Sequence, residues 1–105
     1  MRLLAKNRID IIKRVETEVI KAARIVFNKR ISIVKECRKP PFPDAVSRCV
    51  ACKILHDDYC VKYKYISEYI GMEERSIMKC VAKAREYVFT DEVYSKLYNI
   101  TKSNL

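Results

Sequence analysis

Gly71 is the only glycine among 105 residues, and the chain holds just three prolines. Folds built from β-strands need many tight turns, and glycine and proline are the residues that form them most readily. Residues that favour helices dominate the rest of the chain. This scarcity of turn formers predicts an all-α protein, and the length suits one domain over residues 1–105.

Apolar residues recur at helical spacing along almost the whole chain, as Ile12, Val15 and Val19 do in the first segment. The predicted helices cover about 8–28, 31–38, 43–57, 62–70, 73–88 and 90–100. The prolines at 40, 41 and 43 must interrupt the helical pattern. Thr90 is expected to cap the last helix, and the tail after Thr101 is expected to fray.

The lone glycine separates a short amphipathic segment from a longer one, which is the pattern of a helix-turn-helix over about 62–88. If Ile77 faces inward, the outward side of the second helix carries Arg75, Lys79 and Lys83. Arginine can bind guanine O6 and N7 together. Ser76 could reach a base or a phosphate, and Glu74 could accept a hydrogen bond from cytosine. The alternative is an ordinary solvated helix face.

A stiff basic connector precedes the third predicted helix. Arg38 and Lys39 come just before the prolines, and Arg48 follows about one turn into the next helix. Such residues often hold phosphates or enter the minor groove of DNA. The alternative is a surface that only keeps the protein soluble.

The net charge of +9 favours a polyanionic partner, but it is unevenly distributed. Residues 1–40 hold 12 Lys and Arg against 4 Asp and Glu, whereas residues 71–105 hold 6 against 5. The basic surplus therefore lies away from the predicted helix-turn-helix. A second interpretation follows, in which the basic N-terminal helix docks an acidic partner protein and DNA binding is lost.

No pattern for catalysis or metal binding stands out. Cys49 and Cys52 form a Cys-x-x-Cys pair without the second pair that a zinc site needs, and their spacing is typical of a helix core. The five cysteines are expected to be reduced. His56 precedes two aspartates at a predicted helix end, and no glycine-rich phosphate loop exists. We expect no enzyme activity, no cofactor and no metal.

Four tyrosines cluster around the fourth predicted helix. They could donate hydrogen bonds to phosphates, but half-buried packing with a solvated hydroxyl is the favoured interpretation. The cluster consists of Tyr59, Tyr63, Tyr65 and Tyr69. No apolar run approaches the roughly 20 residues of a membrane span, and the first residues lack a secretory signal, so a cytoplasmic protein is expected.

The order of these segments, from about residue 15 to 100, resembles the C-terminal DNA-binding domain of DnaA, and still more the small stand-alone DnaA-like proteins of phages and mobile elements. Residues 19–28, Val-Ile-Lys-Ala-Ala-Arg-Ile-Val-Phe-Asn, are similar to the opening helix of that family. Residues 38–39 match its basic loop, and residues 47–51 match its Pro/Ala-Arg-x-x-Ala helix start. Residues 66–81 match its Ile-Gly…Thr-Thr-Val signature in register.

The resemblance implies a Trp-repressor-like helical domain that binds duplex DNA in replication or transcription control. It implies that Arg48 reaches the minor groove and that residues 74–76 read the major groove where the family has Asp-His-Thr. Ser76 keeps the hydroxyl chemistry, whereas Arg75 replaces a histidine and Glu73 replaces an arginine. The ATP-binding module of that family has no counterpart in these 105 residues. Whether the protein acts as a monomer or a homodimer stays open.

Overall fold

A central helix, α2, organises the computed structural model, which describes residues 5–34 and 40–105. The other helices surround it, and no strand occurs in these two ranges. The elements are α1 (Ala5–Phe27), α2 (Phe42–Lys53), the π-helical turn η1 (Ile54–Asp58), α3 (Tyr63–Ile70), α4 (Glu74–Thr90) and α5 (Glu92–Ser103). The prediction of an all-α protein is therefore confirmed.

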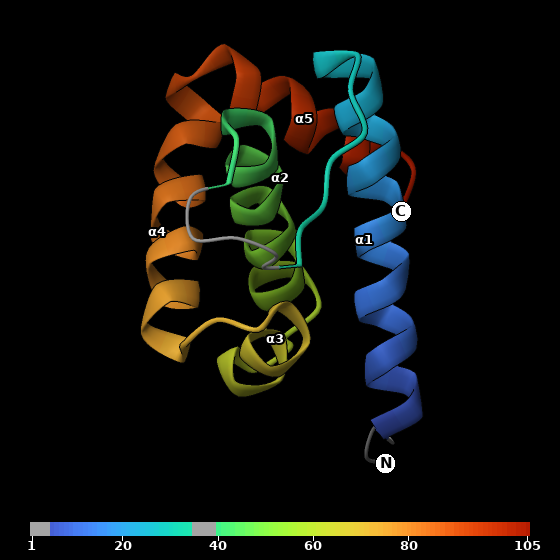
Figure 1. Ribbon diagram of the computed structural model, residues 1–105, viewed down its shortest axis with the longest axis vertical. Helices are drawn as coiled ribbons and strands as arrows, with labels where there is room; N and C mark the ends of the chain where they lie inside the picture. Colours follow the sequence, from blue (N-terminus) through green and yellow to red (C-terminus); the bar gives the residue numbers. More distant parts are fainter. Residues whose placement is uncertain (1–4, 35–39) are drawn as a thin grey trace.

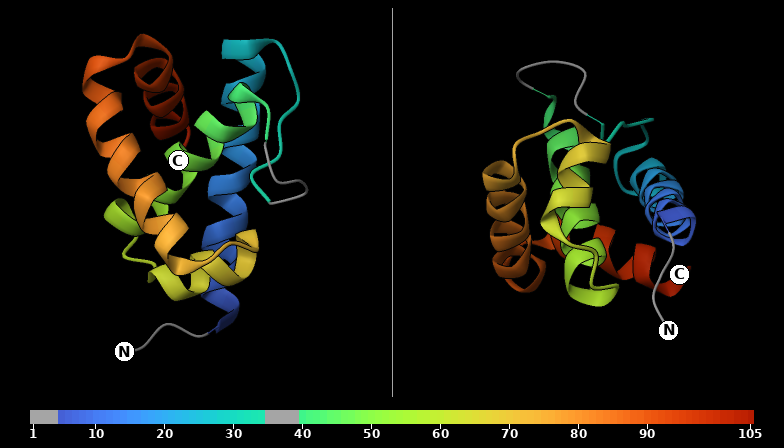
Figure 2. Two further views of the ribbon diagram at one scale, coloured as in Figure 1. Left: turned by 60° about the vertical axis from the view of Figure 1, so that its left-hand side comes forward. Right: turned by 90° about the horizontal axis from the view of Figure 1, so that it is seen from below.

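α2 lies between α1 and α4, and two views of the ribbon agree on this order (Figures 1 and 2). α5 packs against α4, α2 and α1, whereas α3 lies at the opposite end of the bundle and packs against α4 (Figure 1). Every residue of α2 from Val46 to Lys53 is buried. A helix that is buried all round must be enclosed by neighbours on every side, so α2 is the axis of the core.

The predicted apolar stripes form that core. Ile12, Val15 and Val19 of α1 are almost fully buried, as is Leu97 of α5. Burying side chains of this size contributes about 1.5–3 kcal/mol each. Helical periodicity alone thus located the inward faces of the peripheral helices correctly.

Residues 31–34 correct the prediction of a short helix over 31–38, because they are not helical. Ile31 and Ile33 are both buried, which is the alternation of an extended segment. The side chains of α2 supply the hydrogen bonds that a helix would have made. The Ser32 backbone N–H donates to Asp44 Oδ2 at 3.2 Å, and Arg48 Nε donates to the Ile33 carbonyl at 3.0 Å. Residues 35–38 of that prediction lie outside the described residues.

The cap of the last helix lies one residue later than predicted, and the helix itself begins at Glu92. Thr90 is still the final residue of α4, and its hydroxyl donates to the Glu86 carbonyl at 3.3 Å. Asp91 has an extended backbone, and its carboxylate accepts from the backbone N–H groups of Val93 and Tyr94. Asp91 therefore caps α5 in place of Thr90, since a cap residue must leave the helical conformation before its side chain can turn back.

Candidate nucleic-acid interface

The turn at Gly71 joins α3 to α4 and sets the direction in which α4 leaves. Gly71 has a left-handed backbone, with φ 85° and ψ 32°, and its N–H donates to the Ser67 carbonyl at 2.8 Å. The Met72 N–H donates to the same carbonyl, and the Ser67 hydroxyl donates back to the Met72 carbonyl. Glycine adopts this conformation at no steric cost. α3 consequently runs across the start of α4 rather than alongside it (Figure 2).

α4 has one buried side and one exposed side, as its sequence predicted. Ile77, Val81, Ala84 and Val88 are buried. On the opposite side Arg75, Lys79 and Lys83 are exposed and follow each other at intervals of four residues. We call these three residues the α4 cationic row. It points away from α2, and nothing in the described part of the fold covers it.

The α4 cationic row keeps its charge available. No ion pair joins Arg75, Lys79 or Lys83 to a carboxylate within the two described ranges. Arg85, two residues after Lys83, differs because its guanidinium donates hydrogen bonds to both carboxylate oxygens of Asp57, one of them at 2.9 Å. That hydrogen-bonded guanidinium holds the pKa of the Asp57 carboxyl below its usual value. Arg85 thus fastens α4 to η1.

The first turn of α4 is acidic as well as basic. Glu73 and Glu74 are both exposed next to Arg75, and Ser76 is half-buried. Carboxylates favour the positive end of a helix dipole, so they suit this turn structurally. They also repel phosphates, which restricts any approach of a polyanion to the side bearing the cations.

Met78 is an exposed apolar residue that the sequence interpretation overlooked. It is 46% exposed and lies on the outer side of α4, one turn after Arg75. Apolar side chains in a major groove contact the thymine methyl group. The sequence could have indicated its exposure, because Met78 lies outside the inward stripe of Ile77, Val81 and Ala84.

Arg48 requires a correction, because it does not reach the surface. Its side chain lies inside the bundle with 6% of the residue exposed. Nε donates to the Ile33 carbonyl, and Nη1 lies 3.4 Å from the Met72 sulfur. Arg48 is buried because α2 is enclosed on every side. Its two contacts join residues 31–34 to the turn before α4. Its predicted contact with the minor groove is replaced by this internal role.

Arg38 and Lys39, the other predicted connector residues, lie outside the described residues. The cations of α1 are described and lie far from the α4 cationic row. Lys13, Arg14 and Arg24 are exposed on a helix that α2 separates from α4 (Figure 1). The exposed cations Lys13, Arg14 and Arg24 therefore face a different direction from the α4 cationic row.

The thiols on α2 face α4. Cys49 and Cys52 are buried, and both interact with the thiol of half-buried Cys80. Hydrogen bonds to the sulfur, together with the nearby positive charges of Arg48 and Lys83, lower the pKa of Cys80. The hydrogen bond to Cys80 and burial raise the pKa of Cys49 and of Cys52. Across the two described ranges, no group of three or more His, Cys, Asp or Glu residues is arranged to hold a metal ion.

The aspartates after His56 have structural partners. Asp57 is the acceptor for Arg85, and Asp58 accepts from Lys102 Nζ of α5 at 2.9 Å. The His56 ring stacks on Tyr63 with centroids 3.9 Å apart. These contacts tie the end of the central helix to α3, α4 and α5, in agreement with the interpretation of this segment as a helix end.

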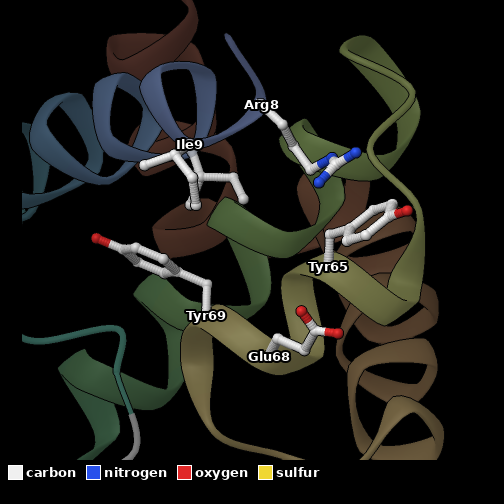
Figure 3. Close-up of a pocket in the computed structure, with 6 residues that line it drawn as sticks. Arg8, Ile9, Tyr65, Glu68 and Tyr69 are labelled. Atoms are coloured by element: carbon white, nitrogen blue, oxygen red, sulfur yellow. The ribbon is translucent and has the colours of Figure 1, made fainter. Parts of the chain in front are cut away.

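A pocket of about 320 Å³ opens between α1 and α3 (Figure 3). The Arg8 guanidinium lies 3.4 Å from the centroid of the Tyr65 ring, and Glu68 stands at its rim. Tyr69 donates to Glu16, and burial together with this carboxylate raises the pKa of Tyr69 to about 12. All four tyrosines of the cluster are half-buried and pack on the core, as expected from the favoured interpretation.

Comparisons of the chain with protein-family models, with curated proteins and with solved structures found no match. None of the helices within the described ranges is both long enough and apolar enough to cross a membrane.

Proposed function

We propose that this protein binds double-stranded DNA sequence-specifically, with α3 and α4 acting as a helix-turn-helix and α4 lying in the major groove. Arg75 reads guanine from the first turn, Ser76 contacts a base or a phosphate, and Glu74 tunes the choice of base. Lys79 and Lys83 hold the phosphates on either side. No cofactor takes part, and the protein is not an enzyme.

The observation that carries this proposal is the α4 cationic row. Arg75, Lys79 and Lys83 are exposed on one side of a helix, and no ion pair within the described ranges has to break before they meet a polyanion. The N-terminal part of a recognition helix is the part that meets base edges, and Arg75 sits there. The glycine turn supports the same assignment, because it sends α4 away from α3 with its outer side uncovered.

The similarity to DnaA-like DNA-binding domains extends the proposal to a Trp-repressor-like domain that controls replication or transcription of a phage or mobile element in the cytoplasm, as a monomer or a homodimer. One family role is not carried over. Arg48 is buried, so Arg38 and Lys39 are the remaining candidates for the contact beside the major groove.

Selection of bound sequences from a random duplex pool tests the proposal, followed by gel shifts across a salt series. Arg75→Ala should flatten the selected motif, at a cost of about 1–3 kcal/mol on the preferred site. Lys79→Ala should weaken binding to all duplex sequences equally and reduce the slope of log affinity against log salt concentration by about 1. Lys96→Ala, an exposed lysine of α5 away from α4's outer side, is the control and should change neither. No binding even at low salt would refute the proposal.

A second candidate is a protein-interaction module that keeps this fold without binding DNA. Exposed Glu73 and Glu74 at the start of α4 favour it, as does the separation of the α1 cations from α4. In that case α1 docks an acidic partner protein. Two results together would support this alternative. The wild type would bind no duplex, and both the wild type and Arg75→Ala would capture the same acidic protein.

A further inference from the structure

The outer face of α1 carries exposed cations that the proposed contact of α4 does not use. We call Lys13, Arg14, Lys21 and Arg24 the α1 cationic row. At 100° per residue they fall on the side directly opposite the buried stripe of Ile12, Val15 and Val19. From Lys13 to Arg24 the row extends about 16 Å along the helix axis.

The chain after α1 adds to this positive surface. Arg30 lines an open hollow of about 320 Å³ together with Thr17, Ile20, Lys21 and Arg24. Three cations around one hollow form a place where a phosphate group can sit between them. The hollow therefore joins Arg30 to the C-terminal half of the α1 cationic row.

Little negative charge neutralises the α1 cationic row. Its one recorded ion pair within the described ranges joins Lys21 to Glu18 at 3.6 Å. Such surface pairs contribute only about 0–1 kcal/mol, so Lys21 can leave Glu18 for a phosphate at small cost. Asp10 is an exposed carboxylate at the N-terminal end of the same face. The face as a whole remains strongly cationic.

The two cationic rows point in opposite directions. α2 lies between α1 and α4 in both ribbon views (Figures 1 and 2). A straight duplex seated on α4 cannot at the same time lie along α1. Any polyanion on α1 must be a separate molecule or a distant segment of the same one.

We propose that the α1 cationic row is a second duplex-binding surface, which contacts the phosphate backbone and lets one molecule bridge two DNA segments. The bridging rests on the proposed function of α4, whereas the phosphate contact of α1 does not. A duplex carries one negative charge for about every 1.7 Å of axis with both strands counted, so about 16 Å of duplex carries roughly ten phosphates, of which only those on the near side face the row. Arg and Lys make such contacts without reading sequence.

An acidic protein fits this face less well than a duplex does. Tight protein interfaces are organised around buried aromatic or apolar anchors. Between Lys13 and Arg24 the outermost positions hold cations and Thr17, and Ile25 at the edge is 70% exposed. One aliphatic side chain at a margin does not form a hydrophobic centre. The charges are spread out as a backbone contact requires.

A bridging assay tests the inference. One duplex is fixed to beads, a second, fluorescent duplex is added with the protein, and the recovered fluorescence is measured across a salt series. Arg14→Gln with Arg24→Gln should reduce recovery on the order of tenfold and lower the salt slope of bridging by about 2. Lys62→Gln with Lys96→Gln removes the same charge from exposed positions outside both rows and should recover as much as wild type.

A third variant separates the two proposals. Arg75→Ala with Lys79→Ala should lose site preference and bridging, yet keep weak, salt-dependent binding of one duplex through α1. If this variant instead binds one duplex as wild type does, the function proposed for α4 fails and the α1 surface stands. If Arg14→Gln with Arg24→Gln bridges like wild type, the α1 surface fails and α4 is untouched.

Two further results would overturn the assignment to DNA. One is light scattering that shows wild-type dimers under bridging conditions and monomers for the Arg14→Gln, Arg24→Gln variant, because dimers bridge without a second surface. The other is competition by poly-glutamate that equals competition by duplex at the same charge concentration. Monomeric wild type together with weak competition by poly-glutamate supports the second duplex surface.

Discussion

Substituting Gly71 measures the free-energy cost of the left-handed backbone in the turn between α3 and α4. A Cβ added at this position would meet no atom within 4 Å, so space does not limit the substitution. The backbone does, because φ is +85°. A left-handed conformation costs an L-residue about 1–2 kcal/mol. Alanine also restricts the unfolded chain, which returns about 0.4–1 kcal/mol.

Gly71→Ala should therefore destabilise the domain by about 1 kcal/mol, the difference between these two effects. For a domain of this size the melting temperature should fall by about 4–8 °C. Urea unfolding followed by circular dichroism measures the loss. Gly71→Asn is the matched control and should lose less, because asparagine tolerates the left-handed region. An alanine variant as stable as wild type, or one weakened by more than about 3 kcal/mol, would refute the backbone argument.

Three other expectations concern capping, charge and thiols. Asp91→Ala should cost about 1 kcal/mol in urea unfolding, and Thr90→Ala should cost far less, because only Asp91 accepts the first backbone N–H groups of α5. The pKa of Asp57 is lowered in the fold, so its stabilisation is present above the unfolded value of 3.8 and is lost as the pH falls through the lower folded value. Asp57→Asn should thus lose less stability than wild type between pH 5 and pH 2 in urea titrations, and an identical pH profile would contradict the pairing. At pH 7 iodoacetamide should alkylate Cys80, whose pKa is lowered, while buried Cys52 reacts only after unfolding, as peptide mass spectrometry would show. Equal rates at the two thiols would contradict that arrangement.

Much of the predicted interface could be read from the chain because it depends on helical periodicity. Once Ile77 is placed inward, the geometry of a helix sends Arg75 and Lys79 outward, and both are exposed. Gly71 marked the turn because glycine adopts a left-handed backbone without steric cost, whereas no such sign marked Asn28 and Cys60, which are left-handed as well. These inferences need only the neighbours along the chain.

Arg48 shows where such reasoning ends. A charged residue one turn into a helix is exposed in most proteins, and the four-residue spacing of Val46, Val50 and Ile54 predicts only one apolar side for this helix. The structure buries the whole of Val46–Lys53, because neighbours pack on all sides of α2. Arg48 is tolerated there since the Ile33 carbonyl, left without a helical partner, accepts a hydrogen bond from its Nε–H group.

The order of residues by itself determined that this protein is helical, where its peripheral helices turn their apolar sides and where the glycine turn between α3 and α4 falls. Only the tertiary structure decided that α2 is enclosed, that residues 31–34 are extended, and that the cations of α1 and α4 face opposite ways. The reason is physical. Periodicity is set within a few residues of a helix, whereas the surroundings of a helix depend on contacts between segments that lie far apart in the chain.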